Sequence, residues 1–373
     1  MLDDRVVWWP FEDAKVFVEA VFSAAGVPNE DAKTCTEILL ESDKRGIESH
    51  GIGRLKPIYI DRIREGTLQP VTKTEIVRES PATAVVDGHN GMGFVVAKAS
   101  MELAIKKAAV YGIGMVATRH SNHYGIAGYY PLMATERGMI GITGTNARPS
   151  IAPTFGVENM LGTNPLTFGM PTDEDFPFLL DCATSITQRG KIEVHDRAGK
   201  DIPEGWVIGH DGRIRTDTHQ ILSDLVSGQA ALLPLGGPGE ALAGYKGYGY
   251  ATVVEILSAS LQNGYFLKML NGFDELGNKR PFGVGHFFIA INVESFIELE
   301  EFKRITGTIL RELRASKKAP GADRIYTAGE KEHLAWLERK DKGVPVNTTL
   351  QKQMSGLKET YGLSDLPLPW EKR

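Results

Sequence analysis

The feature that most constrains the fold is a change in hydrophobic pattern near residue 75. Before it, residues 11–44 carry two apolar stripes at helical spacing, separated by a break at Pro28. A further helix is expected over 54–65, where Pro57 starts or bends it. The N-terminal part of the chain is therefore predicted to be helical.

After this point, short apolar and β-branched runs alternate with glycine and proline, which is typical of strands joined by turns. The runs expected to form strands are Thr83–Asp87, Gly114–Thr118, Met139–Thr143, Pro177–Leu180 and Phe287–Val293. Helical patterns occupy 97–111 and 250–263, and the tail from about 295 is helical with a polar interruption near 316–330. This order predicts a central α/β body enclosed by a helical lobe that both chain ends build.

The composition argues against several kinds of protein. The 373 residues include 42 lysines and arginines against 47 aspartates and glutamates, and the net charge of −5 argues against a nucleic-acid-binding surface. No run of about 18 apolar residues occurs, so no membrane-spanning helix is expected. The first five residues, MLDDR, lack the layout of a secretory signal, and two cysteines in so long a chain are typical of a reducing compartment. We therefore expect a cytoplasmic protein.

Common cofactor and metal motifs are missing or out of context. Gly112–Ala117 (GIGMVA) fits the loose glycine pattern of a dinucleotide site, but it follows a helix and enters a strand, which reverses the required order. His120 and His123 have the spacing of a metal-binding pair, yet no cysteine lies nearby and there is only one such close pair. We expect neither a classical glycine loop nor a bound metal.

The main candidates for proton chemistry are His50 and His123. His50 lies in the stretch ESHGIGR between helical segments, where small neighbours leave it accessible. Arg54 follows four residues later, and its guanidinium can bind a carboxylate while the histidine moves a proton. His123 lies in RHSNHYG, after the strand expected over 114–118, where an ordered strand end can face a cleft. A solvated loop is the alternative for both stretches.

Further polar residues follow apolar runs. Thr163 and Asn164 lie in LGTNP, and Asp181 ends the run FLL. A carboxylate there needs a partner such as a histidine or a ribose hydroxyl, or else it caps a following helix. Lys246 lies in GYKGYG where a helix opens, which suits a cofactor phosphate, and an exposed loop lysine is the alternative.

Together these stretches resemble the type-2 malate/L-lactate dehydrogenase family over roughly residues 10–335. The motifs that carry the resemblance are ESHGIGRL (48–55), RHSNHYGIAGYY (119–130), LGTNP (161–165), DCATS (181–185), RGKIEV (189–194), IPEGW (202–206), YKGYG (245–249) and GHFFIAI (285–291). The resemblance implies a homodimeric oxidoreductase that uses NAD, or alternatively NADP, on a small 2-hydroxy or 2-oxo acid, with malate foremost. It also implies an α/β fold whose central mixed sheet binds the cofactor without a Rossmann domain, in agreement with the missing glycine loop.

The resemblance also assigns roles to residues. His50 and His123 are the candidates for proton transfer, without a choice between them, and Arg54 holds the substrate carboxylate, with Arg148 as a further substrate contact. Asp181 is expected to orient or support a histidine. The residues implied to line the cofactor site are Ser121, Thr163, Asn164, Asp181, Thr184 and Lys246. The late stretch YTAGE resembles a family motif in which Ala328 replaces a proline, and the tail after about 335 carries no motif.

The resulting hypothesis is reversible hydride transfer between nicotinamide C4 and substrate C2, with one histidine removing the hydroxyl proton in oxidation and returning it in reduction. The expected lobes are 1–75, 76–295 and 296–373, the last of which joins the first. Within the enzyme class, the alternatives are lactate, ureidoglycolate, sulfolactate, a diketo sugar acid or a cyclic imine carboxylate as substrate. Outside it, the alternative is a non-catalytic nucleotide-binding module.

Overall fold

A seven-stranded mixed sheet forms the centre of the computed structural model, which describes residues 6–371. The strand order is β2-β3-β4-β11-β5-β6-β7, and only the β3–β4 pair is parallel. The strands are β2 (Glu75–Glu79), β3 (Thr83–Asp87), β4 (Ile113–Ser121), β5 (Met139–Thr145), β6 (Leu166–Met170), β7 (Phe178–Cys182) and β11 (Val284–Asn292). The predicted α/β class with a central mixed sheet is confirmed. Residues 1–5, which entered the expectation of a cytoplasmic protein, lie outside the described part of the chain.

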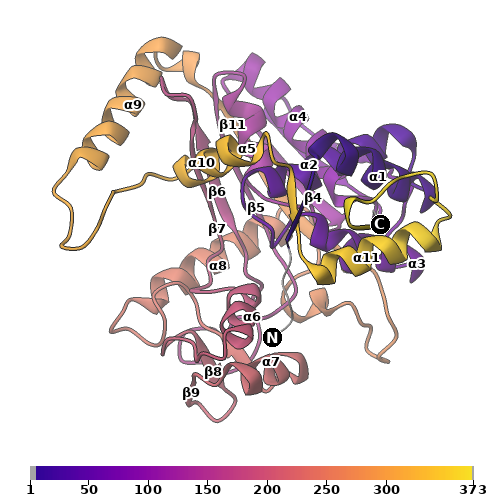
Figure 1. Ribbon diagram of the computed structural model, residues 1–373. Helices are drawn as coiled ribbons and strands as arrows, with labels where there is room; N and C mark the ends of the chain where they lie inside the picture. The colour runs from indigo at the N-terminus through magenta and orange to yellow at the C-terminus, as the bar shows by residue number, and fades with distance from the viewer. Residues whose placement is uncertain (1–5, 372–373) are drawn as a thin grey trace.

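Helices cover both faces of this sheet (Figure 1). α4 (Gly93–Tyr111) and α5 (Tyr129–Thr135) pack on one face, and α8 (Gly244–Ala259) packs on the other. One face of β11 carries Phe288 and Ala290, which lie in the same core as residues of α4. The other face approaches α8 so closely that a Cβ added at Gly285 would lie 1.8 Å from the Ser258 carbonyl oxygen. Since alternate residues of a strand point to opposite faces, a strand covered on both sides must be apolar throughout, as the run FFIAI is.

Close packing also explains the glycines of the stretch Gly112–Ala117. Gly112 ends α4 in the left-handed conformation at φ +81°, and a Cβ added at Gly114 would lie 2.0 Å from the Ala104 carbonyl oxygen of α4. Glycine is needed here so that the helix can stop and the strand can pass close beneath it.

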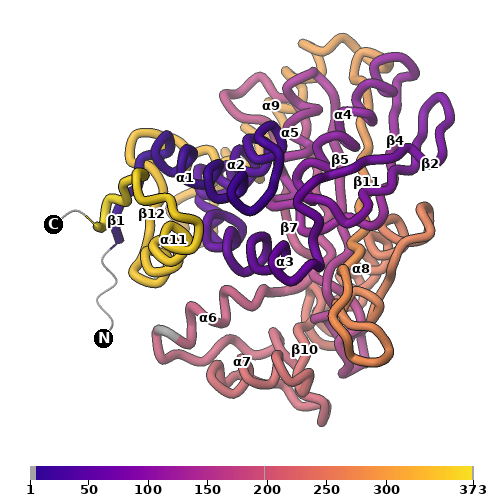
Figure 2. Tube along the Cα trace, turned by 90° about the vertical axis from the view of Figure 1, so that its right-hand side faces the viewer, coloured from indigo at the N-terminus to yellow at the C-terminus, as the bar shows by residue number. Residues whose placement is uncertain are grey.

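The two ends of the chain pack together in a helical lobe (Figure 2). β1 (Val7–Trp9) pairs antiparallel with β12 (Val344–Val346), and Trp9 is buried with its ring 5.1 Å from that of Trp370. Around them lie α1 (Phe11–Ala24), α2 (Asn29–Lys44), α10 (Glu330–Arg339) and α11 (Thr348–Thr360). The core of this lobe continues into the sheet, so the boundaries at 75 and 295 stay predictions.

The helix expected over 54–65 is broken into three short turns. A 3-10 turn (Ile52–Arg54) leads into a π-helix (Leu55–Ile60), and α3 (Asp61–Arg64) completes the segment. Pro57 lies inside the π-helix, because its ring and missing N–H prevent regular α-helical bonding to the preceding turn.

A second, smaller core includes the loop between β5 and β6 and lies at the bottom of Figure 1. Its elements are α6 (Arg189–Arg197), β8 (Val207–Gly209), β9 (Ile214–Arg215), α7 (Thr218–Ser227) and β10 (Ala230–Leu232). Further along the chain, α9 (Leu299–Ala315) stands out from the body, and 3-10 turns occupy Leu267–Asn271, Val293–Ser295 and Pro369–Glu371. Among residues 6–371, no helix has the length and apolar character needed to cross a membrane.

Candidate active site

A cavity of about 400 Å³ lies at the edge of the sheet where β4, β5 and β7 end and β6 and β11 begin. The strand register brings these ends together, because Ser121 pairs with Val284 and Cys182 pairs with Leu166. The turn that follows α2 covers the cavity from the helical lobe. Its lining includes two histidines, two arginines, an aspartate and a phenylalanine, namely His50, His123, Arg62, Arg148, Asp181 and Phe282.

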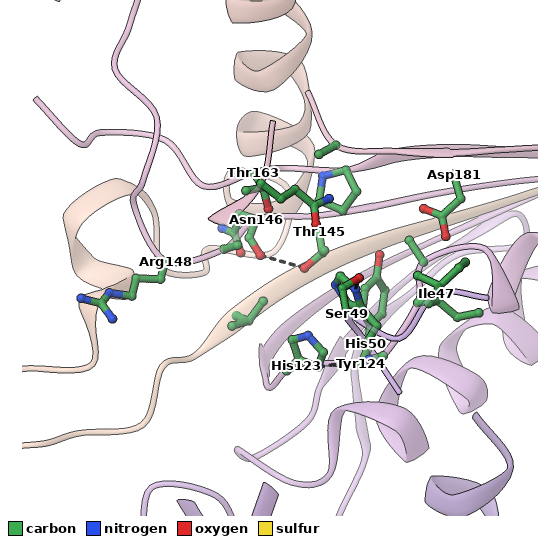
Figure 3. Close-up of a pocket in the computed structure, with 18 of the residues that line it drawn as sticks. Ile47, Ser49, His50, His123, Tyr124, Thr145, Asn146, Arg148, Thr163 and Asp181 are labelled. Carbon is green, nitrogen blue, oxygen red and sulfur yellow. Dashed lines mark hydrogen bonds between the residues drawn. The ribbon is translucent and has the colours of Figure 1, made fainter. Parts of the chain in front are cut away.

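The two candidate histidines lie side by side in this cavity (Figure 3). Their rings stack with centroids 5.5 Å apart and planes inclined by 18°. His50 comes from the turn after α2, and its Nδ1 lies 2.9 Å from the Ser49 hydroxyl. His123 comes from the loop between β4 and α5. Two motifs that are far apart in the sequence therefore form one pair of imidazoles.

A buried tyrosine holds His123 in place. The Tyr59 hydroxyl, on the π-helix, lies 2.6 Å from Nδ1 of His123, and the Gly125 N–H donates to the same nitrogen at 3.3 Å. A backbone N–H can only donate, so Nδ1 accepts and the ring proton is assigned to Nε2. The Nε2–H group is then what His123 presents to a ligand.

Both imidazoles are neutral near neutral pH. Burial lowers the pKa of His50 to about 4, and Arg54 beside it adds to the effect. Burial also lowers the pKa of His123 well below its usual value, with further contributions from His50 and Arg62. Because a charge on one ring opposes a charge on the other, the pair can take up one proton far more readily than two.

Three arginines supply positive charge around the pair. Nε of Arg54 donates to the Ser49 carbonyl oxygen, and its side chain lines a cleft that adjoins the cavity rather than the cavity itself. Arg148, after β5, is exposed, and its guanidinium points away from the histidines in Figure 3. The third, Arg62 on α3, lines the cavity with its guanidinium carbon 4.0 Å from the centroid of the Phe282 ring.

Asp181, on β7, borders both the cavity and the cleft. Its carboxylate accepts the Gly128 N–H at 2.7 Å and the Thr167 hydroxyl at 3.2 Å. Burial raises the pKa of this carboxyl. No hydrogen bond among residues 6–371 joins it to a histidine, and α6 begins only at Arg189, which rules out the alternative that Asp181 caps that helix.

The turn that carries His50 is fixed by a buried carboxyl. Asp43 of α2 accepts the Ile52 N–H at 2.8 Å, and Gly51 lies so close that an added Cβ would meet this carboxyl at 2.1 Å. Arg339 of α10 donates to the Asp43 carbonyl oxygen and to Glu48. α10 therefore helps to hold the SHG turn against the cavity.

The other predicted cofactor residues have varied surroundings. Thr163 lines the cavity. The structure does not bring Ser121, Asn164, Thr184 or Lys246 into the lining of either hollow. Ser121 is bonded to His286 at 2.8 Å, Asn164 donates to Glu255 at 2.8 Å, and the Thr184 hydroxyl donates to the Asn164 carbonyl oxygen at 3.0 Å. Lys246 is exposed in the first turn of α8, which begins at Gly244 instead of at 250.

The adjoining cleft, of about 820 Å³, has the size and polar groups that a dinucleotide requires. It shares Ile47, Ser49, Asp181, Ala183 and Gln188 with the cavity, so the two hollows adjoin each other. The hydroxyls of Ser185 and Thr187, both on its lining, are buried without a hydrogen-bond partner in the described chain. Buried hydroxyls that lack a partner are suited to bind a polar ligand. The residues present therefore fit a nicotinamide cofactor. Residues 6–371 hold no group of three or more His, Cys, Asp or Glu arranged for a metal.

Sequence reasoning missed Tyr59, Arg62 and Phe282. The first two lie in RLKPIYIDRIR, where the sequence predicts only a helix, and the available signal is a second arginine about two turns after Arg54. Phe282 lies in an irregular segment before β11 that carried no pattern. Their contribution depends on contacts between segments distant in the chain.

A neutral imidazole beside guanidinium groups can exchange a proton with a hydroxyl while a carboxylate is held, and the adjoining cleft accepts a dinucleotide. These features define a nicotinamide-dependent dehydrogenase of 2-hydroxy acids, built on a mixed sheet without a Rossmann domain.

Comparison with known proteins gives the same class. The family model described as malate/L-lactate dehydrogenase matches residues 9–355. A malate dehydrogenase of Pyrococcus horikoshii is 45% identical over 98% of this chain and 98% of its own, and an L-sulfolactate dehydrogenase of Methanocaldococcus jannaschii is 41% identical over 95% and 97%. The crystal structure of malate dehydrogenase from Entamoeba histolytica superposes with a TM-score of 0.93 at 43% identity and covers 98% of this chain and 100% of that one. The chain belongs to the malate/L-lactate dehydrogenase family.

Proposed function

We propose that this protein interconverts malate and oxaloacetate with NAD as its cofactor. The observation that carries the proposal is the stacked pair of neutral histidines with guanidinium groups around it, in a cavity that adjoins a dinucleotide-sized cleft. Malate dehydrogenases among its relatives support this choice of substrate. Sulfolactate is the second candidate, favoured by the relative at 41% identity.

His123 is our choice for the residue that moves the proton. Its ring is held through Nδ1 by the buried Tyr59 hydroxyl at 2.6 Å, whereas Nδ1 of His50 contacts Ser49, which is only partly buried. Removal of the substrate proton by Nε2 requires the other neutral tautomer, in which the ring proton is on Nδ1. A hydroxyl can donate or accept, so Tyr59 can pair with Nδ1 in both tautomers. His50 then contacts the same substrate oxygen and orients it.

Arg54 is proposed to hold the C1 carboxylate next to the reacting carbon. It lies close enough to both imidazoles to lower the pKa of each. Its planar fork of N–H donors suits bidentate binding, which positions C2 beside the histidines. Arg148 is retained as a further substrate contact at the far wall of the cavity.

The cofactor, when bound, supplies or accepts the hydride. Ser185, Thr187 and Gln188 are the cleft residues that would bind it, with Thr163 and Asp181 where the cleft meets the cavity. The charged side chains that line the cleft are Glu48, Asp181 and Glu193 against Arg54 and Lys191, which leaves no surplus positive charge for the extra phosphate of NADP. This balance supports NAD.

We also propose that the protein works as a homodimer in the cytoplasm. Tyr250, Val253 and Ile256 on α8 are 57%, 47% and 51% exposed, so this helix presents apolar side chains that a second copy can cover. Lys246 lies on the same helix, where a dimer could bring it to the partner's cofactor. Light scattering on the purified protein tests the dimer. A mass of one chain would refute it.

The test of function is a screen of 2-hydroxy acids with NAD and NADP, followed by absorbance of the reduced nicotinamide. We expect the highest kcat/KM with malate and NAD. Turnover of sulfolactate well above malate would move the assignment to the second candidate, and no turnover of any hydroxy acid would refute the proposal.

The choice of histidine is tested with His123→Asn and His50→Asn. Loss of general acid–base catalysis typically lowers the rate by about 100- to 10,000-fold. We expect a loss of this size in kcat for His123→Asn and a larger effect on KM than on kcat for His50→Asn. The reverse pattern would assign the proton to His50.

A further inference from the structure

Arg62 has a feature that the proposed chemistry at C2 does not use. Among residues 6–371 it forms no ion pair, although three other partly buried arginines do, namely Arg119 with Asp87, Arg314 with Glu174 and Arg339 with Glu48. No hydrogen bond of its side chain to the described residues is present either. An unpaired charge that is largely removed from water is unfavourable, so such a group is suited to bind an anion.

The surroundings of Arg62 hold its guanidinium in one place. The guanidinium carbon lies 4.0 Å from the centroid of the Phe282 ring, so one face of the group is covered. The ring itself is confined, because an added Cβ at Gly272 would lie 2.9 Å from it. The N–H donors lie in the guanidinium plane, so stacking on Phe282 leaves them available. Two of them can bind two oxygens of one acid group.

The position of Arg62 relative to the histidines indicates which part of a substrate it would meet. Arg54 lowers the pKa of both His50 and His123, whereas Arg62 lowers only that of His123. Arg62 lines the cavity itself, whereas Arg54 lines the adjoining cleft, so the two guanidinium groups belong to the walls of different hollows. Burial lowers the pKa of Arg62 to about 10, Tyr59 and Glu65 oppose this shift, and Arg148 adds a smaller contribution to it.

We propose that Arg62, supported by Phe282, binds a second acid group at the end of the substrate remote from C1, and so selects 2-hydroxy acids that carry two anionic groups. The proposal rests on the proposed function, in which Arg54 holds the first carboxylate. A terminal carboxylate and a terminal sulfonate share the required chemistry, since both present several oxygens with a negative charge. A substrate that ends in a methyl group leaves Arg62 without an anion.

The test compares kcat/KM for oxaloacetate and for pyruvate, with NADH, in the wild type and in Arg62→Met, which keeps an unbranched side chain on Phe282. Loss of a charge-assisted bidentate contact predicts a drop of about 100-fold for oxaloacetate and a far smaller one for pyruvate. Arg62→Lys, which keeps the charge without the fork, is expected to lie between. Arg64→Met removes an exposed arginine from the same turn and is expected to leave both values unchanged.

Equal losses for both substrates would overturn the proposal, because Arg62 would then serve the reaction in general. A loss that appears in the KM for NADH or NADPH would overturn it as well, because the bound anion would be a cofactor phosphate. Calorimetric binding of malate and of lactate, without turnover, separates this proposal from the proposed function. If malate binds more tightly than lactate and Arg62→Met removes the difference, the inference holds even where the turnover screen fails. If turnover succeeds while Arg62→Met leaves the preference intact, the inference fails alone.

Discussion

Removal of one buried hydroxyl offers the sharpest test of how His123 is held. In Tyr59→Phe the ring remains, packed on Phe94 with centroids 4.6 Å apart, and only the contact of 2.6 Å to Nδ1 of His123 is lost. During reduction the imidazole must carry an extra proton, so the hydroxyl then accepts from a charged N–H. Hydrogen bonds to charged groups contribute about 1.5–3 kcal/mol. The expected decrease in kcat is therefore about 10- to 150-fold.

The assay is steady-state reduction of oxaloacetate by NADH across a range of pH. Because the hydroxyl favours the protonated ring, its loss lowers the pKa of His123 further, and the fall in the reduction rate with rising pH should begin at a lower pH than in the wild type. Tyr129→Phe is the matched control, since its hydroxyl donates to Glu37 at 2.7 Å outside the cavity. Thermal unfolding of both variants checks that the fold is retained.

A kcat for Tyr59→Phe within twofold of the wild type, with an unchanged pH profile, would refute the reasoning. The contact would then stabilise the fold without affecting the proton. An equal loss in Tyr129→Phe would show that the effect is not specific to the histidine.

Three further predictions concern the same region. Gly51→Ala should abolish most activity, because the new Cβ would lie 2.1 Å from the Asp43 carboxyl and displace the turn that carries His50; circular dichroism should show that the fold remains. Arg54 and Arg62 both lower the pKa of His123, and bound substrate carboxylates would offset their charges. The pKa that the pH profile of kcat reports for the substrate complex should therefore exceed the pKa that kcat/KM reports for the free enzyme. Equal values would argue against either arginine binding substrate. Burial lowers the pKa of His286 to about 3, so the unfolded chain takes up a proton on it below about pH 6.5 while the folded protein does not. The free energy of unfolding in urea should therefore fall as the pH drops through that window, by up to about 5 kcal/mol, and His286→Gln should flatten the decline.

The hydrophobic pattern of the sequence was sufficient to predict those elements that carry a long apolar stripe or a long apolar run. The two stripes within 11–44 became α1 and α2, and the break at Pro28 lies where the second helix begins. The run FFIAI became the central part of β11. Each of these elements buries many apolar side chains, and the periodicity of those side chains in the sequence is enough to predict the element.

Short elements escaped this reasoning. β1 and β12 have three residues each, and β8 to β10 are of similar length. Three residues are too few to show a period, and these strands exist because a partner strand and a core lie beside them. The π-helix at Leu55–Ile60 also depends on its tertiary contacts, although Pro57 indicated that the helix would be irregular there.

The site divides in the same way. Motifs in the sequence indicated the family and predicted that His50 or His123 transfers the proton, but they did not choose between them. The tertiary structure brought the Tyr59 hydroxyl to His123 across 64 residues of chain, put Arg62 on Phe282, and turned Ser121 towards the buried His286. The physical reason is that a proton's position and a charge's burial depend on what lies within a few ångströms in space. That neighbourhood is set by how the helical lobe meets the edge of the sheet, and no single stretch of sequence contains it.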